Sequence, residues 1–143
     1  MPIPAPEPGR VLHYNFLWST EAAAGATEGA KARPSVIVMA VTNEEDETIV
    51  IVVPITHSSP HSDDTHIEMP AATCRRLGLD DQRSWIVVAE MNKFVWPGPD
   101  LRRIPGNDSL WHYGDIPPKL FEQIKAGVQK CQAAGQLKVS NPD

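Results

Sequence analysis

Long apolar runs are missing from the sequence, and no segment reaches the length that a membrane-spanning helix requires. The start of the chain lacks the basic and apolar regions of a secretory signal, so we expect a cytoplasmic protein with no membrane partner. Cysteine is scarce as well. Cys74 and Cys131 lie far apart, which argues against a disulfide framework or a Cys-x-x-Cys metal site and predicts two partly buried free thiols.

Positive charge is not in excess, because 18 acidic residues stand against 13 basic ones and the net charge is −5. A protein that binds nucleic acid through charge alone is usually basic. The composition therefore argues against broad, charge-driven affinity for RNA. It is compatible with a small local site that holds one or two phosphates.

The chain has 143 residues, which is enough for one hydrophobic core and short for two. Residues 1–9 are rich in proline and have little to bury, so they predict a flexible N-terminal tail. Residues 10–143 then predict a single domain. Within it, residues 19–32 are small and polar and predict a mobile loop.

Two β-branched runs, residues 35–42 and 48–53, predict core strands that are buried on both faces. The charged segment between them predicts a hairpin turn centred near Glu45. Antiparallel pairing around that centre sets the residues before the first strand beside those after the second. The sequence therefore predicts that Arg33 and Thr56 meet at one end of the hairpin.

The remaining elements follow from periodicity and from turn residues. Several short strands and a final helix predict a mainly β protein, either a small barrel or a strongly bent sheet, with a C-terminal helix and one short helix. Strands are expected at 10–18, 66–70 and 84–92, a short helix at 71–78, and a helix at 117–135 with an apolar face of Leu120, Phe121, Ile124, Val128 and Cys131.

Short motifs in a defined order resemble those of the MazF/PemK toxins of bacterial toxin–antitoxin systems. An Arg-Pro pair precedes one buried strand, a Val-Pro-Ile-Thr segment ends the next, and a glycine-containing loop lies ahead of both. The third strand ends in an acidic residue followed by a basic one. The residues that carry the resemblance are Gly25, Glu28, Lys31, Arg33, Pro34, Val53, Pro54, Ile55, Thr56, Glu90 and Lys93.

The resemblance implies an SH3-like barrel of the CcdB/PemK/MazF type, a homodimer, and a metal-independent endoribonuclease that cuts single-stranded RNA without a cofactor. It also implies an antitoxin partner that binds through a disordered segment and holds the enzyme inactive. In such an enzyme the ribose 2′-hydroxyl attacks the adjacent phosphorus, and the product carries a 2′,3′-cyclic phosphate.

Arg33, Thr56 and Glu90 are the predicted catalytic residues. The Arg33 guanidinium matches two phosphoryl oxygens, the Thr56 hydroxyl donates beside it, and Glu90 is the expected base. The predicted auxiliary residues are His57, Glu28 and Lys93, and the predicted RNA-binding residues are Lys31, Ser58 and Trp96. RNA bases are expected to be recognised by the loops at 19–32 and 57–65.

Two positions depart from the pattern of some family members. Thr27 stands where they carry a histidine, and Val88 stands where they carry an arginine. Two alternatives therefore stay open beside the nuclease. One is a non-cleaving binding protein on the same fold, such as a CcdB-type gyrase inhibitor, and the other is a catalytically degenerate homologue.

Two further groups of side chains have competing interpretations. Packing in the core or in a dimer interface is favoured for each tryptophan, including Trp85. Trp96, beside a Pro-Gly-Pro turn, is the one more expected to be exposed and able to stack on a base. Histidines and aspartates gather in one polar loop, but their spacing matches no known metal site, so we predict solvated side chains and no metal. This second group consists of His57, His61, His66, Asp63 and Asp64.

Overall fold

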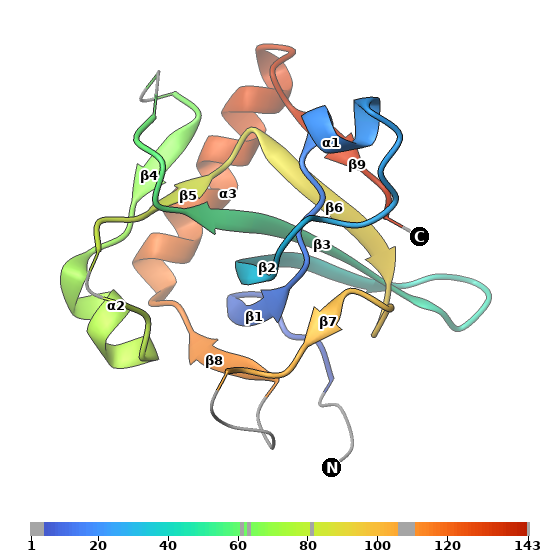
Figure 1. Ribbon diagram of the computed structural model, residues 1–143, viewed down its shortest axis with the longest axis horizontal. Coiled ribbons are helices and arrows are strands. Elements are labelled where there is room, and N and C mark those ends of the chain that lie inside the picture. Colours follow the sequence, from blue (N-terminus) through green and yellow to red (C-terminus); the bar gives the residue numbers. More distant parts are fainter. Residues whose placement is uncertain (1–4, 61, 63, 81, 106–110, 143) are drawn as a thin grey trace.

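The structure is a computed structural model that describes residues 5–60, 62, 64–80, 82–105 and 111–142 (Figure 1). Three helices occur in these ranges, α1 (Ser19–Ala23), α2 (Ala71–Leu77) and α3 (Pro118–Ala133). The predicted mainly β fold with a C-terminal helix is confirmed. The described strands are β1 (Arg10–Tyr14), β2 (Arg33–Thr42), β3 (Thr48–Thr56), β4 (His66–Glu68), β5 (Trp85–Val87), β6 (Glu90–Val95), β7 (Leu101–Arg102), β8 (His112–Asp115) and β9 (Lys138–Ser140).

The hairpin of β2 and β3 is the central element of the sheet and forms as predicted. Its register runs from Thr42 opposite Thr48 down to Ser35 opposite Pro54, with one irregularity in the pairing of β2. The Asn43 carboxamide oxygen closes the turn by accepting two backbone N–H groups at 2.9 Å each. The turn extends away from the rest of the molecule in Figure 1.

Strand β3 pairs with different partners along its length, which bends the sheet. Its first half lies beside β6, from Ile49 to Val52, and its end lies beside β5, with Ile55 opposite Ile86. On the other side of the hairpin, β1 pairs with β2, β7 and β8. The sheet order is β4-β5-β3-β2-β1-β7, and β9 joins β6 in parallel.

The prediction of one strand over 84–92 is wrong, because the chain turns between β5 and β6. The two turn residues, Val88 and Ala89, remain buried at 1 % and 9 % exposure, so the apolar run continues through the corner. Gly127 of α3 makes room for Val88, since a Cβ there would lie 3.1 Å from a Val88 methyl. A continuous apolar run therefore does not reveal where the chain changes direction.

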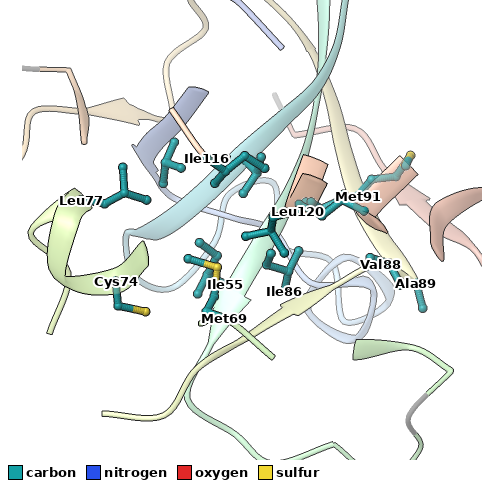
Figure 2. Packing of buried hydrophobic residues seen from close by; sticks show 14 of the residues in the cluster. Ile55, Met69, Cys74, Leu77, Ile86, Val88, Ala89, Met91, Ile116 and Leu120 are labelled. Atoms are coloured by element: carbon teal, nitrogen blue, oxygen red, sulfur yellow. The ribbon is translucent and has the colours of Figure 1, made fainter. Parts of the chain in front are cut away.

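The main hydrophobic core lies between α3 and the sheet. Figure 2 shows Ile55, Ile86 and Leu120 pointing toward one another from β3, β5 and α3. The predicted apolar face of α3 is confirmed, with Ile124 and Cys131 fully buried. Both cysteines are free and buried, as expected from their spacing.

Two further predictions are corrected by the structure. Residues 19–32 begin with α1 and are not a loop throughout, because the Glu21 carboxylate accepts the Trp18 N–H at 2.9 Å and supports the first turn of α1. The outer half of β2 is not buried on both faces, since Met39 is 49 % and Val41 52 % exposed.

The boundary between tail and domain remains a prediction. Gly9 is buried, its N–H donates to the Ile37 carbonyl, and its own carbonyl accepts the Ile116 N–H. No helix among the described residues is long and apolar enough to cross a membrane.

Candidate functional site

A pocket of about 510 Å³ opens where β2 begins and β3 ends. Its walls also include the loop after α2, residues 104 and 105, and β8. The predicted meeting of Arg33 and Thr56 at one end of the hairpin is confirmed, because both line this pocket. Its other polar side chains include those of Lys31, His57, Asp80 and Tyr113.

Arg33 is half-buried, and its guanidinium lies over the ring of Trp18, with 5.0 Å between Cζ and the ring centroid. Such a cation over an aromatic face is stabilised by about 0.5–2 kcal/mol. The Arg33 Nε is buried and has no hydrogen-bond partner among the described residues. Burial lowers the pKa of Arg33 and Glu21 opposes that shift, but the guanidinium stays charged because its ordinary pKa is so high. A fixed cation therefore lies in the pocket.

Thr56 is only 7 % exposed at the end of β3. Its Oγ1 accepts the Ser58 N–H at 3.1 Å, which orients the side chain and gives the segment after β3 a tight turn. A hydroxyl that accepts one bond still has its hydrogen to donate. Thr56 can therefore donate to an anion held by Arg33.

Trp18, which supports the guanidinium, is held by two side chains of β6. The Glu90 Oε1 accepts the Ser19 N–H at 2.7 Å. The fully buried Asn92 carboxamide accepts the Leu17 N–H at 2.8 Å and donates to the Leu17 carbonyl at 2.7 Å. These bonds fix the backbone on both sides of Trp18.

The described residues that line the pocket do not include Glu90. Its carboxylate is bonded to the Ser19 N–H, so the geometry supports a positioning role through Trp18 more directly than proton transfer at the pocket. The sequence indicated that Glu90 ends the third core run, but it could not show which backbone group the side chain meets. A role as base stays a prediction.

The loop ahead of β2 is held by two residues that the sequence analysis did not select. Both carboxylate oxygens of Glu21 are used, since Oε1 accepts the Trp18 N–H and Oε2 accepts the Ala30 N–H at 3.1 Å. Gly29 lies directly against the backbone of Phe16, in the segment that follows β1. An added Cβ at Gly29 would be 2.1 Å from the Phe16 carbonyl oxygen. These contacts join residues that are 9 and 13 positions apart, so no local sequence pattern predicts them.

His57 stands at the rim of the pocket with both ring nitrogens near acceptors. Nδ1 lies 3.0 Å from the Arg83 carbonyl oxygen, and Nε2 lies 2.9 Å from a carboxylate oxygen of Asp80. These two contacts orient the imidazole at the rim of the pocket.

The other predicted site residues divide into two groups. Lys31 and Ser58 line the pocket. Lys93 lies instead in a groove beside α3, and Trp96 is half-buried against the aromatic residues packed around β1. Glu28 is exposed on the loop before β2 and is not among the described lining residues.

The two departures from the family pattern have different surroundings. Thr27 is exposed in the loop ahead of β2. Val88 is a core residue against Gly127 and lies outside the described lining of the pocket, so an arginine there would need a different packing of α3.

The described residues contain no group of three potential metal ligands. His61 and Asp63 of the predicted polar cluster lie outside the described residues. Asp64 pairs with Lys130 at 3.4 Å, and the His66 Nδ1 lies 2.7 Å from the Thr65 hydroxyl.

A half-buried arginine, a lysine and a threonine hydroxyl around one pocket form a set of groups that can bind an anion such as a phosphate. The family described as the PemK-like, MazF-like toxin of type II toxin-antitoxin system matches residues 9–131. The chain therefore belongs to this toxin family, and the family implies an antitoxin partner. No curated protein matches the sequence.

Proposed function

We propose that this chain is the toxin of a type II toxin–antitoxin system and a metal-independent endoribonuclease that cuts single-stranded RNA. The observation that carries the proposal is the presence of Arg33 and Thr56 in one pocket of about 510 Å³, each held in a defined orientation. Membership of the toxin family supports it.

The reaction needs positive charge and donors at the phosphate. As the 2′-oxygen attacks phosphorus, negative charge grows on the phosphoryl oxygens. Arg33 and Lys31 supply positive charge there without a metal ion, and the Thr56 hydroxyl donates to one oxygen. The 2′-hydroxyl gives its proton to solvent water as the new P–O2′ bond forms, the P–O5′ bond breaks, and the product carries a 2′,3′-cyclic phosphate.

The leaving 5′-oxygen needs a proton. His57 is the donor that we propose, because it lines the pocket and its imidazole is oriented by Asp80 and the Arg83 carbonyl. Glu90 is bonded to the Ser19 N–H and does not line the pocket, so we do not place it at the phosphate.

The proposal is tested by incubating purified protein with single-stranded RNA in EDTA. The unmodified protein is expected to cut, and Arg33→Ala to lose about 100-fold or more of the rate, because a group that stabilises transition-state charge is gone. Thr56→Val keeps the shape of the side chain and is expected to lose about tenfold. Arg75→Ala, on the exposed side of α2, removes the same charge elsewhere and is expected to leave the rate unchanged.

The alternative of a gyrase inhibitor gives a different result in cells. Inducing the gene in bacteria would then damage DNA and leave RNA intact. Growth arrest with fragmented RNA supports the nuclease, and unaltered growth with intact RNA would identify a degenerate homologue.

We also propose that two copies of the chain associate through an exposed apolar face of the sheet. Val41, Ile49 and Val95 lie side by side on three neighbouring strands, and Met39 and Val139 continue the same face. Exposed apolar patches of this kind mark interaction surfaces, and a twofold dimer uses the same patch on both copies. We expect the dimer to act in the cytoplasm, where RNA and an antitoxin meet it.

A further inference from the structure

The lining of the pocket carries both signs of charge. Lys31 comes from the loop before β2 and Arg33 from the first position of β2, and the Asp80 carboxylate comes from the loop after α2. The Asp80 carboxylate contacts the His57 Nε2 at 2.9 Å, but it repels a phosphate, so its remaining acceptors favour a ligand that also carries hydrogen-bond donors. A nucleotide has a phosphate at one end and hydrogen-bond donors on its base at the other, so its polarity matches that of the pocket.

Tyr113 of β8 gives the carboxylate side a fixed aromatic ring. Its hydroxyl lies 2.9 Å from Nδ1 of His13, and the two rings meet edge to face at a centroid distance of 6.0 Å. Burial, and then Arg102, lower the pKa of His13, so the imidazole is neutral and Nδ1 can accept from the tyrosine. The tethered ring lines the pocket and offers a base a surface on which to stack.

Asp80 is fixed as well and keeps unused acceptor capacity. Its Oδ1 accepts the Gln82 N–H at 3.1 Å, and its Oδ2 lies 2.9 Å from the His57 Nε2. A carboxylate has about four lone-pair positions, so acceptors remain after these two contacts. Burial, and then the charge of Asp80, raise the pKa of Tyr113.

We infer that Asp80 and Tyr113 form a base-binding subsite beside the phosphate site at Arg33 and Thr56, and that it favours bases with an exocyclic amino group over uracil. The inference rests on the proposed ribonuclease function. Tyr113 stacks on the base, and Asp80 accepts from the amino group of cytosine, adenine or guanine. Uracil presents two carbonyl oxygens around a single N–H, and those oxygens are repelled by the carboxylate. Recognition thus involves the loop after α2 and β8, beyond the loops at 19–32 and 57–65.

The test is cleavage of a pool of RNAs that contains every dinucleotide step, followed by sequencing of the fragment ends. At one position next to the cut, amino-bearing bases are expected to exceed uracil by about tenfold or more, the range of a hydrogen bond to a charged group. Asp80→Asn is expected to bring that ratio within about twofold while the cutting still depends on Arg33. Asp46→Asn, in the hairpin turn, makes the same change of charge away from the pocket and is expected to keep the ratio.

Tyr113→Leu removes the ring and is expected to raise KM about tenfold with little change in kcat, whereas Tyr113→Phe keeps stacking and is expected to stay close to the unmodified protein. Competition by the four ribonucleoside 3′-monophosphates needs no variant, and 3′-UMP is expected to be the weakest. Equal cutting beside uracil and beside amino-bearing bases would contradict the subsite but not the ribonuclease function. The same holds if Asp80→Asn leaves the ratio of amino-bearing bases to uracil unchanged. Intact RNA with the unmodified protein overturns both.

Discussion

Replacing Gly29 with alanine is expected to displace the loop that carries Lys31 toward the pocket. The added Cβ would lie 2.1 Å from the Phe16 carbonyl oxygen and 2.6 Å from its carbon, whereas ordinary contact begins at 3.4 Å. Both atoms belong to backbone that continues β1, so no side chain can rotate away. The loop has to move by more than 1 Å relative to β1, judged from these same distances.

That movement disturbs the bond between the Ala30 N–H and Glu21, and with it the path of the chain into β2. A displacement of about 1 Å near reacting groups costs up to about 100-fold in rate. We therefore expect Gly29→Ala to slow RNA cleavage about tenfold to 100-fold and, as an overpacked site, to lose about 1–3 kcal/mol of unfolding free energy.

Gly25→Ala is the matched control in the same loop. Gly25 has φ +97° and no atom within 4 Å of the added Cβ, so alanine there costs backbone strain of about 1–2 kcal/mol without a clash. Cleavage rates are measured well below both thermal midpoints, which come from circular dichroism. Equal cleavage rates for Gly29→Ala and Gly25→Ala would show that the close approach of Gly29 to Phe16 does not position the site.

Three further predictions concern β6, a buried carboxyl and the apolar face. Glu90→Gln keeps an acceptor for the Ser19 N–H and is expected to retain most of the RNA cleavage that Glu90→Ala loses; a complete loss in Glu90→Gln would instead make Glu90 the base. Burial, and then the charge of Glu28, raise the pKa of Asp100. The folded state therefore binds the Asp100 proton more tightly than the unfolded state does. The stability that this proton contributes is complete below the unfolded pKa of about 3.8 and is lost as the pH rises through the folded pKa. Asp100→Asn is therefore expected to raise the thermal midpoint at pH 7 by a few degrees and to flatten its rise on acidification, and an unchanged pH profile would contradict this. Val41→Glu is expected to convert a dimer into a monomer in light scattering, and a monomer before the substitution would show that this face is not the interface.

The hairpin and its meeting of Arg33 with Thr56 could be predicted because the signals are local. Two β-branched runs and a charged turn define the pairing, and the pairing alone brings two positions 23 residues apart into one pocket. The helix at the C-terminus followed in the same way from its apolar period.

The support of the site could not be predicted because it depends on contacts between distant segments. Glu90 reaches a backbone group 71 positions away, and Gly29 meets the backbone of Phe16 across a loop. The corner after β5 stayed hidden because Val88 continues the apolar run, and the direction of the Glu90 side chain depends on that corner.

The central claim is that Arg33 holds the phosphate that is cut. It is tested most directly by treating a defined single-stranded RNA in EDTA with the unmodified protein and with Arg33→Ala, and by measuring the mass of the fragment ends. We expect fragments that end in a 2′,3′-cyclic phosphate with the unmodified protein and a rate lower by about 100-fold or more with Arg33→Ala. Intact RNA with the unmodified protein, or equal cutting by both proteins, would contradict it.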